Sequence, residues 1–318
     1  MNQRSPIFVW GLGALLALPS CGGEQRKADA PPTIRVGDER TQDEPEPVAQ
    51  PEVKGVIVWT RPEDSEQATS YWLDPDGNVV KEQAGIFLLA DGKEWEFSKS
   101  VGKMPVFECD AALGSTPSDP AEPKETMAPA LIEVKTRRSW DLWELPQPPG
   151  PDEGYADYSQ NVGLIASAGR YLVLANFTWV YSCGAHGFSV ADYTAYDLQT
   201  KQKLALLSPA ETNELKGHEL AQAVAAFKAA GDGFDEPTEE QVTLINVIPE
   251  VTAEGKLQAD LVFSIGTCYA CTRGEGSSYT ATTRVVAEEL PRTLAEQPLP
   301  RAVARFAATH QVRGWSAR

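Results

Sequence analysis

The chain has 318 residues and a formal net charge of −17, with 45 acidic side chains against 28 basic ones. This charge excludes nucleic acid as an expected partner, because nucleic-acid binding depends on neutralisation of phosphates by Lys and Arg. It also disfavours docking onto anionic lipid. A hydrophobic content of 42%, with eight tryptophans, permits a sizeable core.

Residues 1–20 are typical of a bacterial lipoprotein signal peptide. Arg4 gives a positive start, and Ile7–Leu18 is an uncharged, mostly apolar stretch. As a helix this stretch covers about 18 Å, too little for a bilayer core of about 30 Å. Leu18-Pro19-Ser20-Cys21 resembles the lipobox, in which the cysteine thiol accepts diacylglycerol. An ordinary secretory peptide with a chance cysteine is the alternative.

Lipidation at Cys21 predicts the lipid bilayer as a partner. Several acyl chains, palmitate among them, give a stable anchor where a single chain would not. Gly22 stands where lipoproteins retained in the inner membrane carry aspartate. In a diderm bacterium the predicted location is therefore the outer membrane, facing the periplasm or the cell surface.

Residues 21–54 are predicted to be an acidic, proline-rich tether. Between Gly22 and Lys54 the chain has no aromatic residue, and such a segment buries too little apolar surface to offset its chain entropy. We expect residues 55–318 to form a single strand-rich globular unit. Sub-domains at 55–145 and 155–318 are the alternative division.

Short strands and tight turns are predicted for Gly55–Phe97. Asp74-Pro-Asp-Gly77 combines a proline and a glycine as a turn does, and its glycine is at the wrong step for a calcium-binding loop. Residues 110–130 are predicted to be an exposed loop, and 146–151 a second break. Further strands are expected at 131–145, 163–168, 171–181, 192–198, 204–207, 242–251, 257–265 and 279–286.

The main helix is predicted at about 209–230. Ser208 can cap it, Pro209 suits the first helical position, and Glu211 completes a capping box. A short amphipathic helix at about 300–309 is predicted to end the fold. The fold class is therefore α+β, with strand-rich antiparallel sheets and few helices.

Four cysteines remain after Cys21, namely Cys109, Cys183, Cys268 and Cys271. An even number in an oxidising compartment predicts two disulfides, and the sequence leaves three pairings open. Cys109–Cys183 with Cys268–Cys271 is preferred. A zinc site of Cys183, His186, Cys268 and Cys271 is an alternative, although it leaves Cys109 without a disulfide partner. A redox pair at Cys268–Cys271 is a third interpretation.

Two motifs carry a resemblance to a known family. Tyr181-Ser-Cys-Gly-Ala-His-Gly187 and Tyr196-Asp-Leu-Gln-Thr-Lys201 resemble a domain of unknown function found at the carboxyl end of some cell-wall deacetylases and in a lysozyme-sensing anti-sigma factor. Cys183 and the missing glycine after Thr200 depart from that family's pattern. The matching residues are Gly184, Ala185, His186, Gly187, Asp197 and Thr200.

The resemblance implies an extracytoplasmic module used for binding, without deacetylase activity. The expected function is therefore non-enzymatic binding or sensing in the cell envelope, with an envelope polymer or a basic protein as ligand and no cofactor. The expected ligand loops are 184–188 and 272–279, with Gly184, His186, Phe188, Arg273 and Tyr279 as candidate binding residues. The alternatives are a hydrolase or metal-dependent enzyme centred on His186, and a purely structural lipoprotein.

Overall fold

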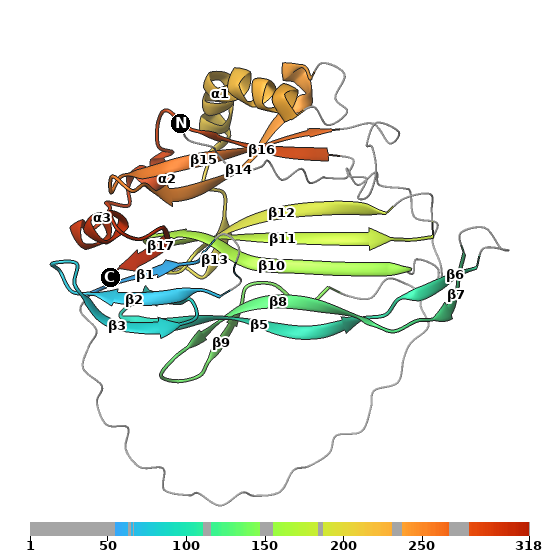
Figure 1. Ribbon diagram of the computed structural model, residues 1–318, viewed down its shortest axis with the longest axis horizontal. Coiled ribbons are helices and arrows are strands. Elements are labelled where there is room, and N and C mark those ends of the chain that lie inside the picture. The colour runs from blue at the N-terminus through green and yellow to red at the C-terminus, as the bar shows by residue number, and fades with distance from the viewer. Residues whose placement is uncertain are drawn as a thin grey trace, which may run out of the picture. The chain divides into compact units, whose positions relative to one another are not determined.

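The structure is a computed structural model that describes residues 55–62, 65, 67–110, 116–146, 155–183, 187–230, 237–266 and 280–317. Strands dominate it, with few helices, as Figure 1 shows. This confirms the strand-rich α+β fold class. The predicted signal peptide, the acylated cysteine and the tether lie outside the described residues.

Eight strands form the largest sheet. Every neighbouring pair is antiparallel except β10 and β17, which run parallel. Strands that precede residues 146–154 in the sequence and strands that follow them therefore belong to one sheet. In order across it they are β13 (Gln202–Leu204), β12 (Phe188–Asp197), β11 (Tyr171–Tyr181), β10 (Asp157–Ala168), β17 (Val312–Ala317), β1 (Val56–Thr60), β2 (Thr69–Leu73) and β3 (Val79–Ala84).

The central strands of this sheet are buried on both faces. On β1, Val58 packs into one hydrophobic core and its neighbour Trp59 into another. On β11, Val173 belongs to the first core, while Leu172 and Leu174 belong to the second. Because successive side chains of a strand point to opposite faces, a sheet covered on both sides needs continuous apolar runs such as these.

The first core lies between the large sheet and a second, three-stranded antiparallel sheet with its helices. From the long helix α1, Leu215, Ala223 and Phe227 are buried in this core. The elements on this side are α1 (Pro209–Ala230), the 3₁₀ helix η1 (Glu239–Gln241), β14 (Val242–Val251), β15 (Leu257–Gly266), β16 (Thr280–Val286), α2 (Arg292–Ala295) and α3 (Arg301–Ala307).

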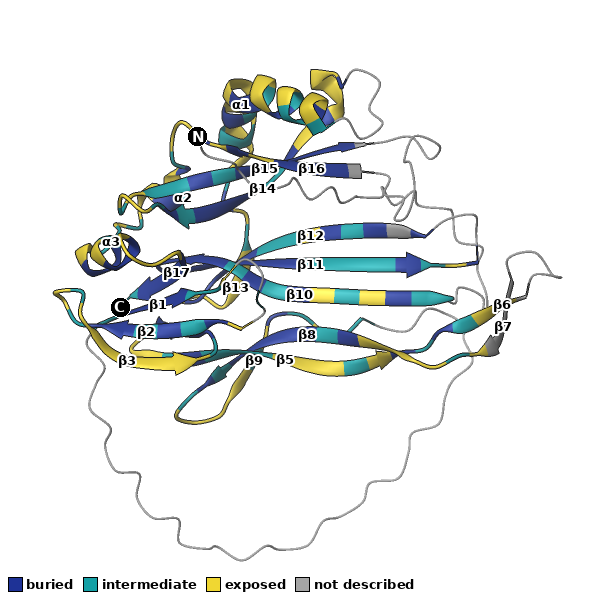
Figure 2. Cartoon of the chain, viewed as in Figure 1, coloured by how far each residue is buried: buried dark blue, intermediate teal, exposed yellow. Residues whose placement is uncertain are grey.

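The second core lies between the large sheet and a four-stranded sheet. Its strands, β4 (Phe87–Ala90), β5 (Lys93–Met104), β8 (Lys124–Glu133) and β9 (Ser139–Asp141), contribute Leu88, Trp95 and Leu131 to that core. Figure 2 shows part of β8 buried while β3 is exposed along its length. Every residue of β4 is buried as well. A separate hairpin pairs β6 (Phe107–Asp110) with β7 (Thr116–Pro120).

Two predictions about particular elements are wrong. The expected loop at 110–130 contains β7 and most of β8. Its prolines indicated an exposed loop, but residues such as Ala128 and Ala130 are buried. Pro129 interrupts no pairing, since it stands opposite Lys99 in the β5–β8 ladder, and its carbonyl accepts the backbone N–H of Leu142 at 3.0 Å. The predicted C-terminal helix does not end the fold either: β17 follows α3 and lies between β10 and β1.

The helix predictions are confirmed. The main helix spans Pro209–Ala230, and the short C-terminal helix spans Arg301–Ala307. The turn at Asp74 is also confirmed, since Asp74 Oδ1 accepts the backbone N–H groups of Asp76 and Asn78, each at 2.9 Å. The Asn78 side chain also donates to Asp74 Oδ2 at 2.9 Å. This bond, followed by the backbone bonds, lowers the pKa of Asp74.

Candidate binding site

An open cavity of about 510 Å³ lies where the short strand β13 ends. Ligand pockets commonly measure about 300–1,000 Å³, so this volume suits a small molecule or a short stretch of a chain. The cavity is bordered by residues 193–195 on β12, 203–207 on and after β13, Thr212 on α1, and 244–247 on β14.

The cavity is lined by both apolar and polar residues. Its apolar lining includes Leu204, Leu206, Leu207, Leu244 and Val247. The polar lining comes from Tyr193, Thr194, Lys203, Thr212 and Asn246. An apolar concavity with a small number of polar groups is typical of a ligand site, because burial provides affinity and the polar groups fix orientation.

Strand edges border the cavity on both sides. β13 pairs only with Ala195–Asp197 of β12, so Phe188–Thr194 has no strand partner on the side away from β11 in the described part of the chain. Opposite, the described residues of β14 pair with β15 alone. Because consecutive residues of each strand line the cavity, the backbone as well as side chains borders it.

Asn246 is a residue of the cavity lining whose side-chain amide nitrogen has no hydrogen-bond acceptor. It follows an irregularity in the β14–β15 ladder between Leu244 and Asn246, and its Nδ2 is buried without a hydrogen-bond partner. A buried unsatisfied donor costs about 1–3 kcal/mol of folding free energy. Departures of this kind concentrate at functional sites, where function outweighs the loss of stability.

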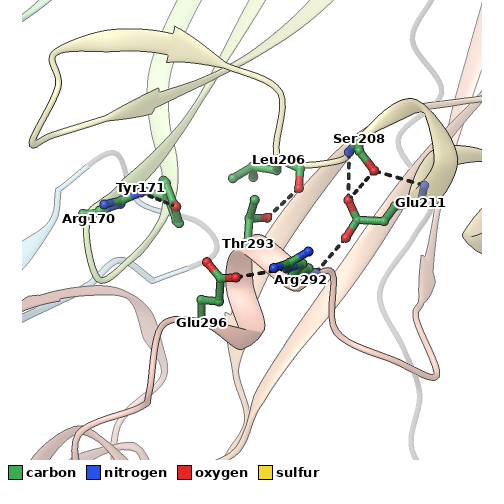
Figure 3. Close-up of polar contacts among 8 residues, drawn as sticks. All are labelled: Arg170, Tyr171, Leu206, Ser208, Glu211, Arg292, Thr293 and Glu296. Atoms are coloured by element: carbon green, nitrogen blue, oxygen red, sulfur yellow. Dashed lines mark hydrogen bonds and ion pairs between the residues drawn. The ribbon is translucent and has the colours of Figure 1, made fainter.

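The wall formed by Leu206 and Leu207 is held in place by polar contacts (Figure 3). Thr293 donates its hydroxyl to the carbonyl of Leu206. Just beyond, Glu211 Oε2 accepts the backbone N–H of Ser208 at 2.9 Å, and Glu211 Oε1 accepts that of Arg292 at 2.9 Å. The cavity is therefore largely pre-formed.

Glu211 and Ser208 form the capping box that the sequence predicted. The backbone N–H of Glu211 donates to Ser208 Oγ at 3.2 Å, and Ser208 Oγ donates to Glu211 Oε2 at 2.6 Å. The hydrogen bonds from Ser208, followed by that from the Arg292 backbone, hold the pKa of the Glu211 carboxyl below its ordinary value.

Tyr193 connects the cavity to the neighbouring sheet. Its hydroxyl is hydrogen-bonded with Arg284 and Thr282 of β16. Burial raises the pKa of Tyr193, and these two partners only partly oppose the shift. β12 begins at Phe188, the last residue of the predicted ligand loop 184–188, and β16 begins directly after the loop 272–279. The bonds of Tyr193 therefore connect the two strands that leave these loops.

The predicted ligand residues themselves fall almost wholly outside the description. Gly184, His186, Arg273 and Tyr279 lie outside the described residues, and Phe188 is described only as the first residue of β12. The roles predicted for these residues stay predictions. Sequence reasoning missed the cavity, because its lining comes from four separate segments without a shared motif. The only local signal was the apolar run at 204–207 before the capping box.

One disulfide joins the β6–β7 hairpin to the end of β11. It links Cys109 and Cys183, whose Cα atoms are 5.4 Å apart, which is the pairing preferred from the sequence. A cysteine in a disulfide offers no thiolate, so the zinc set loses Cys183 as a ligand. Cys268 and Cys271 lie outside the described residues, as does His186. Within the described ranges, no three His, Cys, Asp or Glu residues cluster as a metal site would require.

The second motif of the resemblance forms a tight turn. Asp197 Oδ1 accepts the backbone N–H groups of Gln199 at 2.8 Å and Thr200 at 3.4 Å, and Asp197 pairs with Arg170. Lys201 follows with a φ of 57°. This left-handed conformation favours glycine, the residue that the resembled motif carries after its threonine.

Neither the scan against protein-family models nor the search of curated proteins found a match. Among the residues described, no helix has the length and apolar character needed to cross a membrane. What the fold and the site define is a strand-rich α+β protein with an open cavity of mixed apolar and polar lining at the edge of its largest sheet.

Proposed function

We propose that this chain is a lipid-anchored, non-enzymatic binding module of the bacterial cell envelope. It is attached through acylated Cys21, carried on the 21–54 tether, and takes a chain-like ligand of the envelope in the cavity between β12–β13 and β14. An envelope polymer or a basic protein supplies that ligand.

The observation that carries the proposal is the cavity itself. Its volume of about 510 Å³, its leucine-rich walls and its few polar groups suit a ligand. The cavity is open to solvent, so a short segment of a long ligand chain can enter it while the rest of that chain stays outside. The buried Nδ2 of Asn246, which lacks an acceptor, is a donor that a change of the Asn246 side-chain rotamer would offer to the ligand.

The sequence supports the setting. The lipobox-like Leu18–Cys21 and the acidic tether predict an anchored domain outside the cytoplasm. The resemblance around Tyr181–Gly187 and Tyr196–Lys201 points to a module that binds rather than catalyses. The Cys109–Cys183 disulfide fits an oxidising compartment, since disulfides persist there and are rare in the cytosol.

A bulky residue at the mouth of the cavity tests the proposal. Ala205 lines the cavity and is exposed, so Ala205→Trp fills the mouth without disturbing the core. Binding of peptidoglycan fragments and of a basic protein such as lysozyme is measured calorimetrically with the acylated full chain in detergent micelles. We expect at least one to bind, and Ala205→Trp to weaken it about tenfold or more.

The matched control is Ala221→Trp, which adds the same ring at an exposed position of α1 away from the cavity. This variant should bind as the unmodified chain does. The proposal fails if neither probe binds, or if the two tryptophan variants lose affinity equally.

A further inference from the structure

We propose that the free edge of β12, residues Phe188–Thr194, binds an extended segment of a cationic polypeptide as an added β-strand. The inference rests on the proposed function and names the class of ligand that the site takes. The added strand would continue the line of β13 along the large sheet.

The pairing of β12 leaves the edge available. In the described part of the chain, every residue of β12 from Phe188 to Asp197 pairs with β11, whereas β13 covers only Ala195–Asp197. In an antiparallel strand every second residue directs its N–H and C=O to each side, so Phe188–Thr194 presents a row of backbone groups away from β11. Peptides add to edges of this kind through main-chain hydrogen bonds.

The cavity gives this edge a means of selection. Tyr193 and Thr194 belong both to the free edge and to the cavity lining. Alternate side chains of an added strand point to the same face, and Tyr193 and Ala195 share the first-core face with Leu204, so an apolar side chain beside Tyr193 would enter the leucine-lined space. Main-chain bonds then supply affinity, and the cavity selects which side chain is accepted.

The other free edge of the same sheet lacks these features. β3 (Val79–Ala84) is exposed at every residue, and none of its residues lines the cavity. It carries Lys81 and Glu82, and charged side chains on an edge strand disfavour pairing with another chain. The Lys81 ammonium instead lies 3.8 Å from the centre of the Trp72 ring.

Charge decides which extended segment fits. Each chain carries a formal charge of −17, so pairing of two copies through β12 brings like charges together. Asp192 is an exposed carboxylate on the edge itself. Partial desolvation by neighbouring groups nevertheless raises the pKa of this exposed carboxyl, and the nearby Lys203 only partly opposes the rise. A cationic partner is therefore favoured over a second copy.

Hydrogen exchange of the full chain tests the inference with a defined probe. The probe is a synthetic heptapeptide of alternating lysine and valine, at low salt because screening weakens charge attraction. We expect amide exchange in 188–194 to slow about tenfold on binding. A peptide N-methylated at alternate positions keeps its charge but loses donors along one edge, and should not protect these amides. A glutamate-for-lysine analogue should bind about tenfold more weakly.

Two charge reversals locate the site. Asp192→Lys should weaken binding of the lysine–valine peptide about fivefold or more, because it places a second cation beside Lys203. Glu82→Lys makes the same change on the β3 edge and should leave the affinity unchanged. Protection of 79–84 instead of 188–194, no protection of any strand edge, or protection caused by dimerisation without peptide would each overturn the inference.

The outcomes separate this inference from the proposed function. If Ala205→Trp abolishes binding of an envelope ligand while no probe protects 188–194, the cavity stands and strand addition fails. If 188–194 is protected and Ala205→Trp binds envelope ligands normally, strand addition stands and the cavity proposal fails.

Discussion

Gly314 and Gly217 occupy opposite environments. Gly314 on β17 lies against β10 and β1, and a methyl group there would be 2.5 Å from Nε1 of Trp59 and 2.6 Å from the backbone nitrogen of Ser167. Trp59 Nε1 donates to Ser167 Oγ at 2.9 Å, so the collision would fall on a buried hydrogen bond. Gly217 in α1 has no atom within 4 Å of the same position.

We predict that Gly314→Ala lowers the free energy of unfolding by about 2 kcal/mol or more. Overpacking of a close-packed core typically costs about 1–3 kcal/mol, and the buried bond between Trp59 and Ser167 would be strained as well. Urea unfolding measures the change. An unchanged midpoint would show that β10 and β17 are not packed as described.

Gly217→Ala is the matched change and should act in the opposite direction. Alanine is favoured over glycine inside a helix by about 1 kcal/mol, and the open surroundings of Gly217 impose no steric cost. We expect the urea midpoint to rise. A fall would indicate that Gly217 has a role beyond helix geometry.

Glu211 makes part of the stability dependent on pH. Its folded-state pKa is lowered from the ordinary value of 4.5, so its contribution is present above that value and is lost as pH falls through the folded pKa. Glu211→Gln should cost about 1 kcal/mol at pH 7, as loss of a cap does. The difference between the two proteins should shrink as the pH is lowered toward 3. A difference that does not change with pH would show that the carboxylate charge is not involved.

At the scale of elements, the β6–β7 hairpin depends on a covalent connection. It forms a two-stranded sheet of its own, and the Cys109–Cys183 disulfide joins it to the end of β11 across 74 residues of sequence. A disulfide that closes a loop of this length strongly restricts the conformations of the unfolded chain. The disulfide therefore holds the hairpin beside the end of β11.

We predict that replacing both Cys109 and Cys183 by serine lowers the free energy of unfolding by about 2–4 kcal/mol, the range for disulfides that close long loops. Chemical unfolding without reductant isolates this pair from Cys268 and Cys271. The unmodified chain treated with reductant serves as the control. A double variant as stable as the oxidised chain would contradict a native Cys109–Cys183 bond.

Elements with local signals were predictable, and those that depend on distant partners were not. α1 was located from Ser208, Pro209 and Glu211, which act within one helical turn. β17 was missed because its short sequence is stabilised by β1, whose Val56 pairs with Ala317. The cavity was missed for the same reason, since β12, β13 and β14 approach each other only in the folded chain.

At the scale of the whole molecule, the largest sheet organises both the core and the site. Its central strands are covered on both faces, which accounts for the long apolar runs on β1 and β11. The candidate site lies at one end of that sheet, where β13 stops short and leaves an edge of β12 beside β14. Binding therefore needs no opening of the core.

The anchor gives a prediction for the intact protein. Cys21→Ala should abolish incorporation of a palmitate analogue and release the protein from the membrane fraction, because the proposed anchor is attached to the Cys21 thiol. Cys109→Ala is the control and should remain labelled. Labelling that persists in Cys21→Ala would contradict the proposed anchor.

The central claim, a ligand site in the cavity between β12–β13 and β14, is tested most directly by methyl NMR of the full chain labelled at leucine and valine. On addition of the lysine–valine peptide or of peptidoglycan fragments, we predict shifts concentrated at Leu204, Leu206, Leu207, Leu244 and Val247. Methyl groups of the second core, such as those of Leu88 and Leu131, should not move. Shifts confined to residues away from the cavity, or no shifts at saturating concentrations of both probes, would contradict the account.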